Sequence, residues 1–323
     1  MKRIYTLIML IIAPFAYSQE SPREMVFVHS YHFGYPWVRQ YRSGFDSQIK
    51  EFVIHDFQMD TKRRPKSDFE VISDQAWAFI EEKNPDVVVL ADDNALKYLG
   101  PRLTKHRIPT FFLGVNANPR QYVNITGNIS GVLERPLLKR SVHMIKKLQP
   151  DAKRIKVMMD AAATSDAILQ TSFANKKSLV INGIEVSAYL VNTIEEWQQH
   201  VDSVIEDGFD ALIIANYAAL KDSQGTHIPL EDVSRWTSQH TEVPLYAFWT
   251  YSVGKGKAIG GLAISALEQG AEVAVLVNQY VESGNMPVIS TPKKGAMVFS
   301  EYELDRWSIN VPEELLNRAE LRE

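Results

Sequence analysis

The sequence predicts an α/β protein made of two doubly wound parallel-sheet lobes with a ligand cleft between them. Apolar segments of strand length alternate with segments of helical periodicity along most of the 323 residues. This alternation is typical of a parallel sheet that carries helices on its faces. Two stretches, 119–134 and 250–265, break the rhythm, and we interpret them as crossings between two halves. The length alone also suggests about two domains.

The chain is organised around its first strand, loop and helix. Residues 25–28 form an apolar run, which indicates a strand buried on both faces. The loop 29–37, HSYHFGYPW, follows, and apolar residues then recur at helical spacing at Val38, Tyr41 and Phe45. Ligands of open α/β sheets bind beyond the carboxyl ends of the strands, so we expect this aromatic loop to line the site.

The remaining elements follow from the same two periodicities. In the first half we expect strands at 57–60, 85–91 and 108–114 and helices at 68–82 and 95–103. In the second half we expect helices at 137–148, 166–177, 193–206 and 230–240 and strands at 154–159, 184–191, 211–216 and 244–249. A long helix at 265–283, a further crossing at 288–300 and a helical tail from 303 complete the chain.

These elements predict a division into lobes. Residues 19–120 with about 254–285 form the first lobe, and about 121–253 with about 286–323 form the second. Several crossing segments then act together as a hinge that opens and closes the cleft. The lobe that holds the C-terminal segment stays open at this point.

Composition excludes some classes of function. Hydrophobic residues make up 45% of the chain and charged residues 23%, which is ordinary for a globular protein. The longest basic run is Lys62-Arg63-Arg64, so we expect no nucleic-acid partner. There is no cysteine, which excludes disulfides and a thiol nucleophile. We expect a monomer that needs no cofactor.

The first 18 residues predict an export signal. Lys2-Arg3 precedes a mostly apolar run, and Ala16-Tyr17-Ser18 is a small-x-small cleavage site. We therefore expect a cleaved signal peptide, 1–18, and a periplasmic protein without a lipid anchor, since no cysteine is available to carry a lipid. An uncleaved membrane anchor is the alternative.

Four motifs carry a resemblance to a known family. They are HSYHFGYPW at 29–37, ADDNA at 91–95 with FLGVN at 112–116, DAAATS at 160–165, and VFS at 298–300 with INVPEELL at 309–316. Together they resemble type I periplasmic binding proteins. More narrowly, the chain is similar to the ABC-transporter substrate-binding family that includes tryptophan/tyrosine-binding members. Asp160-Ala161-Ala162 departs from that pattern, since many relatives have Asn-Pro or Asp-Pro there.

The resemblance implies a function. A periplasmic solute-binding protein captures a small molecule, such as an amino acid or related metabolite, and delivers it to an ABC permease. In an alternative, the closed form is presented to a membrane sensor kinase or cyclase. A weaker alternative is a metal-dependent enzyme that uses His29 and His32, spaced H-x-x-H.

We expect the ligand to contact loops of both lobes. From the first lobe the candidates are Ser30, Tyr31, Tyr35, Trp37, Asp92, Asp93 and Asn116, and from the second they are Thr164, Ser165, Asn216, Tyr217 and Trp249.

Residue chemistry suggests a role in ligand binding for each candidate. Thr164 and Ser165 precede a helix and form an anion site or simply cap that helix. One of Asp92 and Asp93 pairs with a ligand ammonium, and the other caps the following helix.

The remaining candidates suit the body of the ligand. The aromatic side chains of the first loop enclose an apolar or cationic group, or Tyr35 and Trp37 form a hydrophobic staple. Asn216 donates and accepts hydrogen bonds to the ligand or ends a strand. Trp249 either packs in the hydrophobic core or contacts the ligand. A carboxylate binder opposite an ammonium binder, with aromatics between, suits an amino acid.

Overall fold

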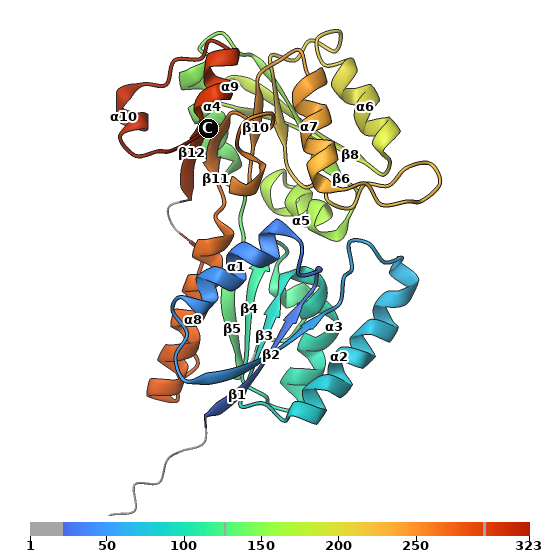
Figure 1. Cartoon of the computed structure of the whole chain (residues 1–323), viewed down its shortest axis with the longest axis vertical. Helices are drawn as coiled ribbons and strands as arrows, with labels where there is room; N and C mark the ends of the chain where they lie inside the picture. Colours follow the sequence, from blue (N-terminus) through green and yellow to red (C-terminus); the bar gives the residue numbers. More distant parts are fainter. Residues whose placement is uncertain (1–21, 126, 293–294) are drawn as a thin grey trace, which may run out of the picture.

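Two lobes, each built on one central sheet, make up the computed structural model, which describes residues 22–125, 127–292 and 295–323 (Figure 1). The predicted fold class is confirmed. The predicted signal peptide, 1–18, lies outside the described residues.

The first lobe has a five-stranded parallel sheet in the order β2-β1-β3-β4-β5. Its elements are β1 (Arg23–His29), α1 (Pro36–Asp46), β2 (Phe52–Gln58), α2 (Phe69–Lys83), β3 (Val87–Ala91), α3 (Asp92–Lys105), β4 (Thr110–Val115) and β5 (Ile129–Leu133). Strands β3 and β4 are buried along their whole length, as their unbroken apolar runs require.

Helix α8 (Ala266–Ser283) belongs to this lobe although it comes late in the chain, and it lies beside α1 (Figure 1). Two glycines allow the close approach. A Cβ on Gly44 would lie 2.0 Å from the Leu267 carbonyl oxygen, and one on Gly270 would lie 1.8 Å from the Tyr41 carbonyl oxygen. The two helices therefore pack backbone against backbone and fix α1 and the loop before it.

The second lobe has an eight-stranded mixed sheet in the order β13-β12-β11-β10-β9-β6-β8-β7. Its elements are α4 (Leu138–Leu148), β6 (Arg154–Asp160), α5 (Ala163–Ser172), β7 (Ser178–Ile181), β8 (Ile184–Val191), α6 (Ile194–Asp202), β9 (Ala211–Ile214), α7 (Leu230–His240), β10 (Leu245–Ala247), β11 (Gly260–Ala263), β12 (Ala296–Ser300), α9 (Glu301–Arg306), α10 (Glu313–Leu316) and β13 (Glu320–Arg322). The sheet is not wholly parallel, because β7 runs antiparallel to β8 and β12 antiparallel to β11.

Strand pairing differs from the expected division of the chain at two segments. Strand β5, inside the presumed crossing 119–134, pairs with β4 of the first sheet. Strand β11, assigned by sequence to the first lobe, pairs with β10 and β12 of the second. Both strands contain glycine, which weakened their apolar pattern and hid them.

Two shorter corrections concern β2 and β12. Strand β2 covers 52–58 rather than 57–60. It lies at the sheet edge and has no fully buried residue, so it lacks the apolar run that marks the central strands. Strand β12 lies within 288–300, where we expected only a crossing. The chain passes from one sheet to the other after β5, after β11 and between α8 and β12, as a multi-segment hinge requires. In the described part of the chain, no helix has the length and apolar character needed to cross a membrane.

Candidate functional site

Side chains from both lobes meet where the strands of each sheet end. The Tyr31 hydroxyl, in the loop after β1, is hydrogen-bonded to the Thr164 hydroxyl in the first turn of α5, at 3.0 Å. The Tyr35 and Tyr251 hydroxyls are hydrogen-bonded at 3.1 Å. All four residues are buried, so the lobes contact each other directly and enclose the space between them.

Glu134 joins the lobes at the base of this interface. Its Oε1 accepts a hydrogen bond from Trp249 Nε1 at 2.6 Å, and its Oε2 accepts one from Asn116 Nδ2 at 3.0 Å. These donors are neutral and the side chain is only 2% exposed. Burial therefore dominates and raises the pKa of Glu134 to about 8. The Asn116 side-chain oxygen is buried without a partner in the described structure.

Asp92 is the carboxylate that faces the interface. Its Oδ1 accepts a hydrogen bond from Trp37 Nε1 at 2.9 Å, whereas its Oδ2 is buried with no partner among the described residues. Burial, together with the nearby Glu134 carboxylate, raises the pKa of Asp92 well above its usual range. Its φ of +70° is a conformation that L-residues rarely adopt, and such strain clusters at functional sites.

Asp93 has a structural role instead. Its two oxygens accept hydrogen bonds from the backbone N–H groups of Asn116 and Ala117, at 3.1 and 3.0 Å, and so hold the end of β4. Neither aspartate caps α3, which corrects the expectation of an N-cap. The Ala95 N–H donates to the Ser30 hydroxyl at 2.8 Å, so Ser30, which directly follows β1 and is fully buried, supplies that bond.

Lys62 places a positive charge at the centre of the interface. It is 6% exposed, and its Nζ lies 4.6 Å from the Tyr31 ring centre and 5.7 Å from that of Tyr35. Its nearest polar contact is the Asn216 side-chain oxygen of the second lobe, at 3.5 Å, while the Asn216 amide nitrogen has no partner in the described structure. No described carboxylate lies within 4.0 Å of the Lys62 ammonium.

Most of these side chains, but not Lys62, line a small chamber of about 10 Å³, room for about one water-sized group. Its lining residues are Tyr31, Tyr35, Trp37, Asp92, Glu134, Thr164, Asn216, Trp249 and Tyr251. A cavity of about 420 Å³ begins on the other side of Tyr31 and Thr164, which line both spaces.

Two of the predicted site residues point away from the chamber. The Ser165 hydroxyl donates to Asp160 Oδ1 at 2.8 Å, and the Ala162 N–H also faces that carboxylate, at 3.3 Å. The expected anion site at this helix start is therefore partly filled by Asp160 itself. The Tyr217 hydroxyl is hydrogen-bonded to Ser252 at 2.7 Å inside the second lobe.

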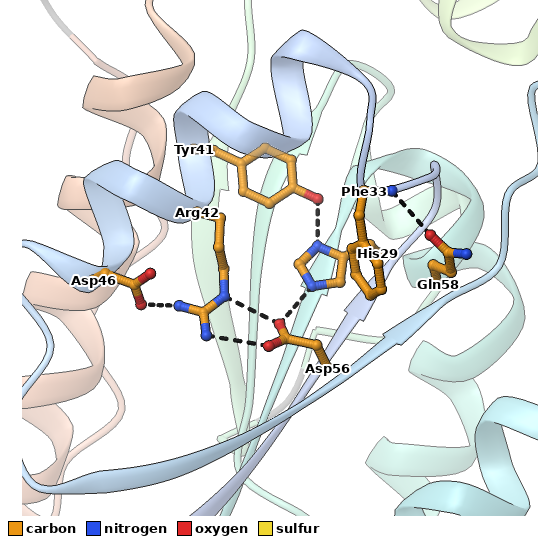
Figure 2. Close-up of polar contacts among 7 residues, drawn as sticks. All are labelled: His29, Phe33, Tyr41, Arg42, Asp46, Asp56 and Gln58. Atoms are coloured by element: carbon orange, nitrogen blue, oxygen red, sulfur yellow. Dashed lines mark hydrogen bonds and ion pairs between the residues drawn. The ribbon is translucent and has the colours of Figure 1, made fainter.

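The H-x-x-H pair does not form a metal site. Both ring nitrogens of His29 are engaged, by the Tyr41 hydroxyl at 2.6 Å and by Asp56 at 2.8 Å (Figure 2). Asp56 also accepts hydrogen bonds from Arg42, which holds α1 to the edge of the sheet. Among the described residues, no group of three potential metal-ligating side chains was found.

Three residues of the interface were absent from the sequence prediction: Lys62, Glu134 and Tyr251. Glu134 directly follows β5, so recognising that strand would have marked it as a strand-end residue. Tyr251 follows Trp249 by two positions in the same loop. Lys62 lies in a polar loop, where burial of a lysine has no sequence signal.

Comparisons with known proteins agree with this architecture. No curated protein sequence matches the chain. The ABC domain from Streptococcus pneumonia, solved in complex with L-Trp, is 17% identical, with a TM-score of 0.70, and the alignment covers 94% of this chain and 100% of that one. A conserved domain protein from Vibrio cholerae is also 17% identical, with a TM-score of 0.65 and the same coverage of both chains.

A third solved structure is a ligand-free, open form. It is a substrate binding protein with adhesive properties from Clostridium difficile, 14% identical, with a TM-score of 0.60, and the alignment covers 93% of this chain and 98% of that one. These likenesses show the two-lobe periplasmic-binding-protein fold. The model of the family described as "ABC transporter substrate binding protein" matches residues 38–322. The chain therefore belongs to the family of ABC transporter substrate binding proteins.

Proposed function

We propose that this solute-binding protein captures an amino acid in the cleft between the lobes, in the periplasm, and delivers it to an ABC permease. One observation carries the proposal. Asp92 and Lys62 are buried, one an acid and one a base, and neither has an ion-pair partner in the described structure. Asp92 contacts Trp37 at the start of α1, and Lys62 lies over the Tyr31 ring. An amino acid supplies a partner for each: its ammonium group for Asp92 and its carboxylate for Lys62.

The free energy of binding favours a ligand that pairs with Asp92 and Lys62 at the same time. An unpaired charge in a buried site is costly, and a bound partner of opposite charge removes that cost. A ligand ammonium is water-sized, fits the chamber and would pair with Asp92 Oδ2, while the ligand carboxylate would face Lys62 and the Thr164 hydroxyl. The Tyr31 and Tyr35 rings offer apolar surface to the body of the ligand.

Closure of the lobes follows from the same contacts. Asp92 and Lys62 belong to the first lobe, whereas Thr164 and Asn216 belong to the second. A ligand that contacts both lobes binds the closed form more tightly than the open one and therefore stabilises it. Family membership supports a permease as the partner of the closed form, and the relative solved with L-Trp supports the amino acid class.

The test is to denature freshly purified mature protein and identify the released small molecules by mass spectrometry. We expect an amino acid at about one per chain, and a thermal shift when the emptied, refolded protein is given that amino acid. Lys62→Met should abolish the shift, whereas Lys50→Met, an exposed lysine outside the cleft, should not. A folded, empty protein that responds to no amino acid would refute the proposal.

A further inference from the structure

Two cavities flank Lys62, and their linings are richer in positive than in negative charge. The larger one, about 420 Å³, lies between the loop after β2 and the start of α5. The smaller one, about 370 Å³, lies between the start of α1 and the start of α7. Lys62 lines both cavities, and Tyr31 and Thr164 lie between the larger cavity and the small chamber, so the three spaces are neighbours in the cleft.

Four cations line the larger cavity: Lys62, Arg64, Lys66 and Lys221. None of them forms an ion pair within 4.0 Å in the described part of the chain. The only carboxylate in that lining is Asp222, and its Oδ1 already accepts hydrogen bonds from the backbone N–H groups of Gln224 and Thr226. The exposed Asp166 stands close enough to Lys66 to feel its charge, but makes no ion pair with it.

The smaller cavity repeats this pattern. Arg39 and Arg63 line it, together with Lys62 and two histidines. Its only carboxylate, Glu231, is already paired with Arg235 at 3.0 Å and Lys257 at 2.7 Å. Arg63 is paired with Asp60, whereas Arg39 has no ion pair among the described residues. A chain with a formal net charge of −4 thus presents a positive cleft.

We propose that the solute is a net-anionic amino acid whose side chain ends in a carboxylate or phosphate. That group lies in the larger cavity beside Arg64, Lys66 and Lys221, while the α-ammonium enters the chamber at Asp92 and the α-carboxylate faces Lys62. The inference rests on the proposed function and narrows its ligand class. A positive cleft also attracts such a ligand at long range and speeds its association.

Isothermal titration with matched ligand pairs tests this assignment. Glutamate against glutamine and aspartate against asparagine probe a carboxylate, and O-phosphoserine against serine probes a phosphate. We expect the acidic member of at least one pair to bind about tenfold or more tightly, since each partly exposed cation contributes about three- to fivefold. Raising the salt from about 0.05 to about 0.5 M should weaken the acidic ligand more than its neutral partner.

Substitutions of the lysines in the larger cavity test whether the acidic group of the ligand binds there. Lys66→Gln and Lys221→Gln should each weaken binding of the acidic ligand about threefold and leave the neutral partner unchanged. Lys50→Gln, an exposed lysine outside the cleft, should change neither. Circular dichroism and thermal unfolding of each variant confirm that it is folded.

Two outcomes would overturn the inference, and they are distinguishable. If neutral amino acids bind as tightly as their acidic partners, or more tightly, the side-chain assignment is wrong and the proposed function stands. If no amino acid binds to the folded protein, the proposed function itself fails and this assignment fails with it.

Discussion

Two polar clusters lie near the carboxyl end of β1, one partly exposed and one buried, and they differ in how completely they are paired. In the first, defined by His29, Tyr41, Asp56 and Arg42, both imidazole nitrogens and both carboxylate oxygens have partners (Figure 2). In the second, defined by Asp92 and Lys62 with Glu134, one Asp92 oxygen and the Lys62 charge lack partners in the described structure.

This difference distinguishes the cluster that stabilises the fold from the cluster that can bind a ligand. A hydrogen-bonded network whose members all have partners contributes modestly to stability, whereas a buried polar group without a partner carries its desolvation cost at all times. The His29 cluster therefore anchors α1 and its aromatic loop. The Asp92 cluster retains a cost that a ligand can remove, and this makes it the site.

Asp92→Asn should break the second cluster with the largest effect. Removing the carboxylate deletes the partner of the ligand ammonium, so we expect amino acid affinity to fall about 100-fold. The free energy of unfolding should change by less than about 1 kcal/mol, because no cation among the described residues is paired with Asp92. Calorimetric titration and urea unfolding measure the two quantities, and Asp202→Asn, an exposed aspartate on α6, is the control.

Asp56→Asn should produce the opposite pattern. It weakens the acceptor shared by His29 and Arg42, so we expect the free energy of unfolding to fall by about 1 kcal/mol, since Asp56 is partly exposed. Affinity for the amino acid should stay at the wild-type value in the folded fraction. A loss of affinity comparable to that of Asp92→Asn, with unchanged stability, would show that the two clusters are not distinct.

Gly114→Ala sharpens the comparison by crowding Asp92 and, less closely, Trp37. A Cβ on Gly114 would lie 2.8 Å from Asp92 Oδ1, and the glycine has a φ of +69°. Gly183→Ala is a matched control, because Gly183 has a φ of +77° and nothing within 4 Å of its Cβ position. Both variants should lose about 1 kcal/mol of stability, but only Gly114→Ala should also weaken binding. Equal affinities for the two variants would argue against a role for the Asp92 position.

Glu134→Gln tests the electrostatics of the site. Burial raises the Glu134 pKa from 4.5 to about 8, so the folded protein holds this proton more tightly than the unfolded chain does. Wild-type stability should therefore fall as the pH rises through that window, by at most about 1.4 kcal/mol per pH unit. The glutamine variant should lack this component of the slope. Urea unfolding at several pH values measures both slopes, and identical slopes would show that Glu134 is not held protonated.

Sequence periodicity predicted most of the fold. Helix 230–240 and strand 184–191 have the predicted boundaries, because their apolar faces are regular and turn residues bound them. Strands β5 and β11 were missed because glycine lowers strand propensity, and only pairing with neighbouring strands reveals them.

The site was less accessible to sequence reasoning. The loop after β1 and the aspartate pair marked the correct edge of the sheet. Which aspartate faces the cleft depends on the backbone at Asp92 and on the two N–H groups that hold Asp93, which no local pattern encodes. Lys62 is buried against the Tyr31 and Tyr35 rings and Asn216 of the second lobe, and such burial arises from tertiary packing.

The most direct test is a double-mutant cycle between the protein and its ligand. Wild type and Asp92→Asn are each titrated with the amino acid recovered from the protein and with its deaminated analogue. We predict that deamination costs wild type about 100-fold in affinity and costs Asp92→Asn less than about threefold, since the ammonium has then already lost its partner. An equal cost in both proteins would show that Asp92 does not receive the ammonium.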